Sequence, residues 1–593
     1  MLIRTYADIK AFPEGEKLTD AEELLIENCK TGEVTTLGDG KRPESPSDER
    51  TIRAGLLRYL ILGGCQGCPV HEWGVTLIGG WVSGQFDLSF ASAKGATVLI
   101  DCGFEQEIVA LQGRFKVFSL NGSALPALNA QGVQVEGNVL LRGLKSAGEV
   151  RLSAAQIGGQ LDCDNAKLNC GKGKALIAHG VCVTGGVFLR GLKSTGEIRL
   201  SGAEIGGQLD CENAELNGGG GKALNAQSSQ TMGNVYLDGL KSTGEVSFSG
   251  AEIDGELTCS NAELNGGGGV ALNVQSARVT GPLFLSGVNS TGGISLSGAE
   301  IGGQLSCINA ELNGGEGKAL NGQRLIVKQG LFWRQMKSVK GKIDLSAAHL
   351  SDLVDDAGSW GRVESLILVG LTYENLVGPP DLEMRKAWLK KGAHFNGQFH
   401  PQPYQQLAKS YRDSGHRREA REILIEKEIE QRKAARRRWI DELHFRRGLR
   451  QYSKKPSDEA KKALAARAAR VPELKNHWIE FFTRRFGSKG DNKNRDPLVS
   501  DLIKQDFRNQ LLWGNAKTIV RLFFHQSGDW IYRYVSGYGY KPARSLLAMA
   551  FLIAIMTALA QISWNMGDLA PNSDVIQTSD DWQRLVQTEK KPS

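Results

Sequence analysis

The chain has 593 residues, 73 of which are glycine, and a formal net charge of +7. This length allows several domains, and the lack of a strict Gly-X-Y triplet excludes a collagen-like triple helix. The first ten residues mix acidic, basic and apolar side chains, so we expect no secretion signal. We therefore expect a reducing environment for the ten cysteines.

Residues 1–47 are predicted to be a polar N-terminal segment, and residues 48–72 a capping helix with a cysteine-containing loop. Ser47 or Asp48 can cap this helix, and Gly63-Gly64 ends it. Its apolar positions follow a helical period and are Ile52, Leu56, Leu57 and Leu60. We expect the helix to cover the first rung of a β-solenoid, whose edge would otherwise pair with other chains.

A long repeat with a constant 48-residue step occupies the middle of the chain. The motif Leu-Arg-Gly-Leu-Lys-Ser begins at residue 141 and again at residue 189, and variants follow at the same step. Clean copies span 137–327, and degenerate copies extend the pattern over 73–378. A fixed period of this length is typical of solenoids, in which stacked repeats bury one continuous core.

Apolar and polar residues alternate within each copy, which indicates β-strands. We interpret each copy as two rungs of about 24 residues, which gives about a dozen rungs in total. The predicted fold is mainly β: a parallel, right-handed β-helix solenoid. An α-helical region and one C-terminal transmembrane helix follow it.

Two residue types recur in the repeat and are assigned structural roles. Rungs stack at about 4.8 Å, so cysteines two rungs apart lie about 10 Å apart, which is too far for a disulfide. We expect the cysteines to form a buried column, and the asparagines two residues later to form a hydrogen-bonding ladder. These residues are Cys163, Cys211, Cys259, Cys307, Asn165, Asn213, Asn261 and Asn309.

Glycine-rich loops in the repeat are candidates for phosphate-binding loops. Gly315–Ala319 and Gly220–Ala223 contain a Gly-Lys pair, but alanine follows the lysine and a strand follows the loop. The copy at Gly269-Val270 lacks the lysine. We therefore predict wide solenoid turns, and we find no dinucleotide-binding fingerprint.

Lysines and glutamates of the repeat form rows that we interpret as a solvated charged face. The glutamates follow the lysines by four residues in three copies. The residues are Lys145, Lys193, Lys241, Lys337, Glu149, Glu197 and Glu245.

The pattern Cys65-x-x-Cys68 with His71 is the one candidate metal or redox site. A zinc site needs a fourth ligand, for which Cys29 is the nearest cysteine, and a thioredoxin-like motif requires a βαβ unit that is not predicted. The sequence favours a structural role and leaves both alternatives open. We predict no catalytic residues and no cofactor.

From Pro379 the pattern changes to helices. Residues 379–450 are a basic region with a helical hairpin over Pro403–Ala434, in which Gly415 provides the turn. Residues 451–496 are predicted to be a charged mobile insertion, and residues 497–544 juxtamembrane helices. Basic residues here are assigned to an anionic membrane surface rather than to nucleic acid, because no nucleic-acid-binding motif accompanies them. They are Arg436, Arg437, Arg438, Lys541 and Arg544.

Residues 545–564 carry no formal charge and are long enough, at about 1.5 Å per residue, to span a bilayer as a helix. The alternative is a buried helix of a soluble domain. Basic residues precede the segment and acidic residues follow it in the tail 565–593. The positive-inside rule therefore places the bulk of the chain in the cytoplasm.

These stretches resemble a bacterial family of repeat proteins usually labelled membrane-associated oxidoreductase. The matching text is Ile52–Gly64, 148–163, 196–211, Tyr404–Glu426 and Gly537–Pro542, and the resemblance covers nearly the whole chain apart from 452–494. The repeat is also similar to pentapeptide-repeat and bactofilin-type solenoids. The resemblance implies a location at the bacterial inner membrane, and no catalytic residues are carried over from it.

The sequence therefore predicts a non-catalytic, membrane-anchored scaffold that faces the cytoplasm and binds an unidentified protein. Two alternatives remain. The first is the oxidoreductase of the family label, and the second is a bactofilin-like filament that assembles through an open solenoid end.

Overall fold

The computed structural model describes residues 18–378, 381–454, 519–520, 523–524, 527–530, 533, 535, 537–566 and 578–589. The chain divides into two compact units. The first comprises Met1–Phe395 and Gln402–His416, and the second Asn396–Pro401 and Arg417–Ser593. Residues 455–496 of the predicted insertion and most of the predicted juxtamembrane helices lie outside the described residues.

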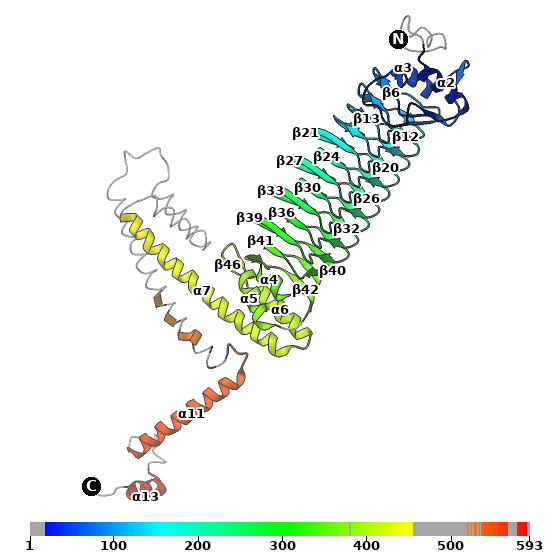
Figure 1. Cartoon of the computed structure of the whole chain (residues 1–593). Coiled ribbons are helices and arrows are strands. Elements are labelled where there is room, and N and C mark those ends of the chain that lie inside the picture. The colour runs from blue at the N-terminus through cyan, green and yellow to red at the C-terminus, as the bar shows by residue number, and fades with distance from the viewer. Residues whose placement is uncertain are drawn as a thin grey trace, which may run out of the picture. The chain divides into compact units, whose positions relative to one another are not determined.

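A parallel β-solenoid of about 14 turns forms most of the first unit (Figure 1). Its strands belong to two long parallel sheets, one with 24 strands and one with 18. Regular turns begin at β5 (Gly74–Ile78) and end at β44 (Thr372–Val377). The solenoid predicted over 73–378 is confirmed.

Each copy of the repeat consists of two turns of unequal length. In the larger sheet, Leu161 pairs with Val187 and Val187 pairs with Leu209, so the first of these two turns is longer than the second by four residues. The extra residues lie in the other sheet, where β27 (Glu215–Asn225) has 11 residues and the next strand, β30 (Lys241–Ser247), has 7. The two predicted rungs of about 24 residues are present, one slightly longer and one slightly shorter than that length.

The remaining strands follow the same scheme. The other long strands of the smaller sheet are β21 (Lys167–Ile177), β33 (Glu263–Asn273) and β39 (Glu311–Asn321), and the other short ones are β24 (Lys193–Arg199), β36 (Asn289–Ser295) and β41 (Ser338–Asp344). In the larger sheet, one row of strands on successive turns consists of β8 (Ala96–Ile100), β12 (Phe118–Ser119), β16 (Val139–Leu140), β20 (Leu161–Asp162), β23 (Val187–Phe188), β26 (Leu209–Asp210), β29 (Val235–Tyr236), β32 (Leu257–Thr258), β35 (Leu283–Phe284), β38 (Leu305–Ser306), β40 (Ile326–Trp333) and β42 (His349–Asp355).

The repeated cysteines lie in the core with free thiols, as expected. Cys163, Cys211, Cys259 and Cys307 are at most 1% exposed. On each turn between two of these cysteines, a leucine takes the equivalent position. The register shows this, because the strand that contains Val187 pairs on one side with the strand before Cys163 and on the other side with the strand before Cys211. Cysteine and leucine therefore alternate along one column of the core.

The repeated asparagines occupy left-handed turns. Asn165, Asn213, Asn261 and Asn309 have φ values of 57°, 53°, 56° and 59°. The turns between them carry glycine at this corner, and a Cβ on Gly191 would lie 2.6 Å from Oδ1 of Asn165. Asparagine thus alternates with glycine at this corner, since both adopt positive φ more readily than other residues do. The hydrogen-bonding ladder expected of the asparagines stays a prediction.

The N-terminal end of the solenoid is covered by two helices, α2 (Asp20–Thr31) and α3 (Ala54–Ile61). Thr19 and Glu22 form a capping box at the start of α2, whose buried face includes Leu25, so the segment predicted to be polar over 1–47 contains a helix that packs against the solenoid. The predicted helix at 48–62 begins later, at Ala54. Its expected first turn contains β2 (Thr51–Arg53), which pairs with β6 (Trp81–Ser83).

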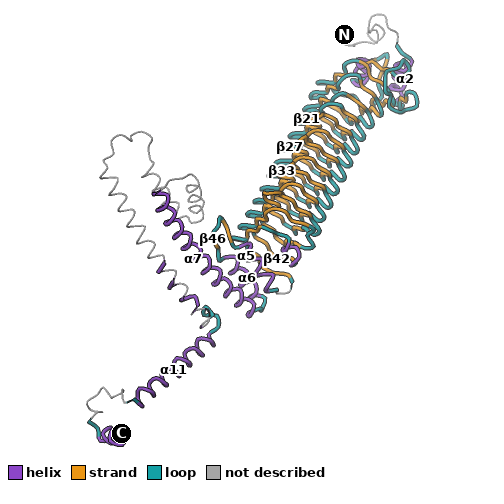
Figure 2. The backbone as a smooth tube through the Cα atoms, turned by 60° about the vertical axis from the view of Figure 1, so that its left-hand side comes forward, coloured by secondary structure: helices purple, strands orange, loops and turns teal. Residues whose placement is uncertain are grey.

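The other end is covered by α4 (Ala357–Gly361), α5 (Leu382–Gly392) and α6 (Gln402–Asp413), which lie beside the last turns (Figures 1 and 2). The Gln402 amide accepts a hydrogen bond from the Gly370 N–H and donates one to the Leu371 carbonyl. Gln406 donates to the carbonyl of Tyr373 in β44. Helices and side-chain amides therefore shield the solenoid edges at both ends.

In the second unit, α7 (Arg417–Lys454) follows the predicted turn at Gly415, whose φ is 84°. Helix α7 is longer than the predicted hairpin arm, which ended at Ala434. The segment before α11 (Pro542–Asn565) contacts α7 through Lys541, whose Nζ lies 3.1 Å from Glu422 Oε1. A last helix, α13, spans Asp580–Glu589.

Helix α11 contains the predicted transmembrane segment. Among the helices in the described part of the chain, it alone is long and apolar enough to cross a membrane. Its stretch Pro542–Ser563 has a mean hydropathy of 2.2, and none of it is buried in the protein.

Candidate functional site

Four long strands of the smaller sheet, β21, β27, β33 and β39, each contain a protruding glycine loop within the strand. These glycine loops are Gly171–Gly173 in β21, Gly218–Gly221 in β27, Gly266–Gly269 in β33 and Gly314–Gly317 in β39. Gly219 and Gly220 have φ values of 60° and 92°, and a Cβ on Gly220 would meet nothing within 4 Å. Glycine is therefore required there by backbone conformation rather than by lack of space.

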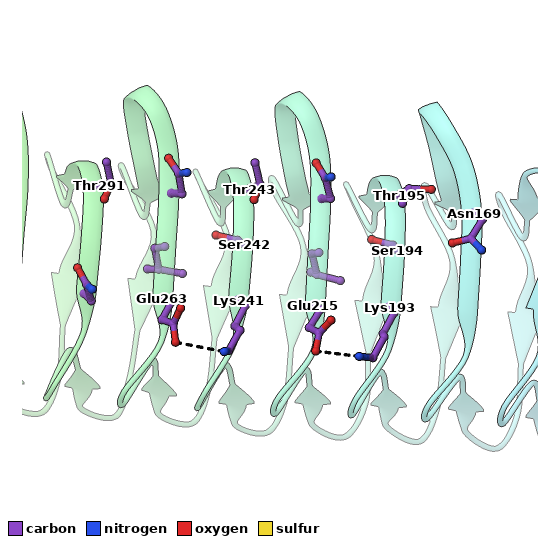
Figure 3. A pocket seen from close by; sticks show the side chains of 15 residues that line it. Asn169, Lys193, Ser194, Thr195, Glu215, Lys241, Ser242, Thr243, Glu263 and Thr291 are labelled. Atoms are coloured by element: carbon purple, nitrogen blue, oxygen red, sulfur yellow. Dashed lines mark hydrogen bonds and ion pairs between the residues drawn. The ribbon is translucent and has the colours of Figure 1, made fainter.

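Asparagine and threonine alternate at the foot of the glycine loops. The register pairs Asn169 with Thr195, Thr195 with Asn217, and so on to Asn313. Asn217 Oδ1 accepts a hydrogen bond from the Gly219 N–H at 3.0 Å, and Asn265 and Asn313 repeat this contact. The asparagines thus brace the glycine loops, and the row lines a polar groove of about 530 Å³ (Figure 3).

The charged row beside this groove consists of ion pairs between neighbouring turns. Lys193 pairs with Glu215 at 2.9 Å and Lys241 with Glu263 at 3.3 Å (Figure 3). The predicted solvated face is present, but the glutamate four residues after each lysine is not its partner. Glu197, for example, binds Arg199 at 2.8 Å.

We use the name slot for the space between two consecutive glycine loops, above the short strand that separates them. In the slots above β24 and β30, a glutamate of the short strand lies at the bottom of the slot and accepts a hydrogen bond from an asparagine of the next turn. Glu197 accepts a hydrogen bond from Asn225 Nδ2 at 2.9 Å, and Glu245 accepts one from Asn273 at the same distance.

The third slot, above β36, departs from this arrangement. Gly293 replaces the glutamate, and Val270 takes the place of a lysine opposite it in the register. The missing side chains leave an open slot of about 630 Å³ between the glycine loops of β33 and β39. Val270 is 36% exposed there.

The one lysine that lines the third slot is held by its neighbours. Lys318 Nζ lies 2.8 Å from Asp344 Oδ2 and 3.0 Å from Asn321 Oδ1. Burial raises the pKa of Asp344, but hydrogen bonds from Lys318 and Ser346 outweigh burial and bring the pKa below its usual value. The slot therefore presents backbone amides and an apolar side chain, which suits binding better than proton transfer.

The candidate cysteine pair lies in a small hairpin at the N-terminal cap. Strands β3 (Gly64–Cys65) and β4 (Cys68–Pro69) are antiparallel, and the two sulfur atoms are 3.4 Å apart. His71 instead accepts a hydrogen bond from the Trp73 N–H through Nδ1 and packs edge-on against the Trp73 ring. Among the described residues, no group of three or more His, Cys, Asp or Glu side chains is placed to hold a metal ion.

The predicted membrane-surface residues lie on two helices of the second unit and on the turn between its segments. Arg436, Arg437 and Arg438 lie on α7, and Arg544 lies in the first turn of α11. Lys541 immediately precedes α11 and pairs with Glu422.

The sequence prediction missed the third slot. Its signal is present in the repeat, because Val270 and Gly293 stand where other copies carry lysine and glutamate. The missing lysine is recognisable in the sequence, but nothing in the sequence links it to the missing glutamate on the next strand. The register of β33 and β36 shows that the two changes face each other.

We compared the chain with models of protein families, with curated proteins and with solved structures, and none of them matches.

Proposed function

We propose that this protein is a non-catalytic, membrane-anchored scaffold whose solenoid binds an extended segment of a partner protein in the third slot. The observation that carries this proposal is the paired change at Val270 and Gly293. It opens one slot of about 630 Å³ in an otherwise regular array.

The dimensions of the slot favour an extended polypeptide. Consecutive glycine loops are two turns apart, and turns stack at about 4.8 Å, so a chain midway between two loops is at strand-pairing distance from both. The loop walls are nearly free of side chains, which leaves backbone groups accessible to such a chain, apart from the Gly267 and Gly315 N–H groups that bind asparagine side chains. Peptides that add to exposed strands gain affinity from main-chain hydrogen bonds and specificity from side-chain contacts. Val270 would supply the apolar contact.

Helix α11 supports the membrane anchor. Its apolar stretch is 22 residues long, and none of it is buried against the described residues of the chain. Arg544 and Lys541 lie at its N-terminal end, and under the positive-inside rule this supports a solenoid on the cytoplasmic side. In this proposal the arginines of α7 contact anionic lipid, and the membrane is the bacterial inner membrane.

One observation weighs against the filament alternative. Filament growth through the solenoid ends requires open edges, whereas helices cover both ends in the described structure.

The proposal is tested by site-specific photo-crosslinking in cells. We expect a photoreactive residue at position 270 to crosslink a protein partner, and the same residue at position 222, in the regular slot above β30, to crosslink none. Val270→Lys, which restores the residue of the other copies, should reduce co-purification of that partner at least tenfold. Lys222→Val is the matched control and should leave it unchanged.

Gly293→Glu is a second variant with the same expected effect. A Cβ at Gly293 would lie 2.6 Å from the Lys318 carbonyl oxygen, so the backbone of Lys318 must shift slightly to accommodate this variant. Equal crosslinking at positions 270 and 222, or undiminished co-purification with Val270→Lys, would show that the third slot is not the binding site.

A further inference from the structure

The hairpin at the N-terminal cap brings two thiols together in a way that the scaffold function does not use. We propose that Cys65 and Cys68 form a reversible disulfide by exchange with an external disulfide, so that the solenoid cap responds to thiol redox state.

The backbone of the hairpin already has suitable geometry. Cys65 and Cys68 are direct partners in the antiparallel bridge of β3 and β4. Such partners have Cα atoms about 4.5–5.5 Å apart, inside the range of about 4.4–6.8 Å found in disulfides. The sulfur atoms are 3.4 Å apart, so a small side-chain rotation closes the bond to about 2.05 Å.

The environments of the two thiols suit two different roles in disulfide exchange. Cys65 suits the attacking nucleophile, and Cys68 suits the resolving thiol. Cys65 is partly exposed, whereas Cys68 is 1% exposed. Desolvation opposes ionisation of Cys65, but hydrogen bonding by Tyr59, Cys68 and backbone amides outweighs it and lowers the pKa of Cys65 to about 7. Burial and the hydrogen bond to Cys65 raise the pKa of Cys68 to about 11.

The reaction needs an oxidant, for which a low-molecular-weight or protein disulfide suffices. The Cys65 thiolate attacks one sulfur of that disulfide, forms a mixed disulfide and releases one thiolate, which takes up a proton. Cys68 then loses its proton and attacks the Cys65 sulfur, which releases the second thiol. Two protein thiols and one external disulfide thus yield the Cys65–Cys68 bond and two external thiols.

The chain offers its own controls. Cys182 is exposed, and Cys29 lies in α2 next to the hairpin, where burial and the charge of Cys68 raise its pKa to about 12. Trypsin separates these residues, because the peptide Tyr59–Lys94 contains Cys65 and Cys68 and no other cysteine.

The test is differential alkylation of the full-length protein in detergent across a series of reduced-to-oxidised glutathione ratios. We expect the peptide Tyr59–Lys94 to lose both alkylation sites and the mass of two hydrogens on oxidation, and to regain them in excess reduced glutathione. Cys182 should form only a mixed disulfide with glutathione. With Cys68→Ser, Cys65 should remain as the glutathione mixed disulfide.

A second measurement uses the protein with both cysteines present and follows the rate of Cys65 alkylation as a function of pH. The rate of Cys65 alkylation should reach half its maximum near pH 7, and Tyr59→Phe should move this midpoint to higher pH. The proposal is overturned if Tyr59–Lys94 keeps two alkylatable cysteines at every ratio. It is also overturned if Cys68 pairs with Cys29, or if reduced glutathione does not reverse the bond.

Discussion

Arg385 of α5 and Asp355 of β42 form a buried ion pair with two hydrogen bonds of 2.7 Å each. Their side chains are 2% and 1% exposed. Trp360 Nε1 donates to the same carboxylate at 2.6 Å, and the Trp360 ring stacks on Trp333 at 5.2 Å. Trp333 follows Cys307 in the core column, since Phe332 pairs with Ser306. The ion pair thus joins the end of the core column to the C-terminal cap.

Removal of one partner of this pair should destabilise the cap strongly. Asp355→Ala leaves a buried guanidinium without its counter-charge, a change that typically costs about 3–5 kcal/mol. Hydrogen exchange should show lost protection in α5 and in β40 to β44, with the early turns unaffected. Lys386→Ala, which removes an ion pair with the exposed Glu383, is the control and should change protection little. Equal effects of the two variants would contradict this role of Arg385 and Asp355.

Glycines at one corner of the solenoid should be intolerant of alanine. A Cβ on Gly303 would lie 2.5 Å from Pro282 N and 2.7 Å from Pro282 Cα, and neither backbone atom can move aside cheaply. We expect Gly303→Ala to lower the free energy of unfolding by about 1–3 kcal/mol. In Gly221→Ala the nearest atom is 3.6 Å away, so denaturant unfolding should detect little change. A larger loss in the second variant would refute this account of the corner.

The cysteine column should be inert in the folded protein. Burial raises the pKa of the Cys163, Cys211, Cys259 and Cys307 thiols far above their usual range, so thiol reagents should label these residues only after unfolding. The exposed Cys182 should label at once. Cys259→Ser should destabilise the turn by about 1–3 kcal/mol, because a hydroxyl without a partner is costly in an apolar core. Rapid native labelling of Cys259 would contradict its place in the column.

Asp344 should make the glycine loop of β39 sensitive to acid. Its pKa is lower in the folded than in the unfolded chain, for which the ordinary value is about 3.9. Its contribution to stability is therefore complete above that value and is lost as pH falls through the lower folded pKa. Asp344→Asn should remove this contribution at neutral pH and weaken the acid dependence. The free energy of unfolding, measured between pH 7 and pH 3, tests the sign.

The repeat made the fold predictable, because the apolar period, the corner glycines and the constant repeat length all describe the same stacked turns. The structure of the N-terminal cap was harder to predict from the sequence. Glu22 reads as a surface residue in sequence, but it is fully buried and binds Arg53, which is distant in the chain. The capping box at Thr19 and Glu22 was a local signal for α2 that the polar composition of the segment concealed.

The third slot was unpredictable for a different reason. Val270 and Gly293 become neighbours only through the register of two parallel strands, and the unequal lengths of successive turns hide this register. Each of these two substitutions alone resembles the sequence variation that is common between repeats. The distance between Cys65 and Cys68 likewise depends on a two-residue hairpin turn, which the spacing allows but does not require.

The central claim, a folded solenoid held at a membrane by α11, is tested most directly by carbonate extraction of membranes from cells that produce the full chain or a chain lacking residues 545–564. We predict that the full chain stays in the membrane pellet. The shortened chain should appear in the soluble fraction with its cysteine column still protected from labelling. Extraction of the full chain by carbonate, or retention of the shortened chain in the pellet, would contradict the claim.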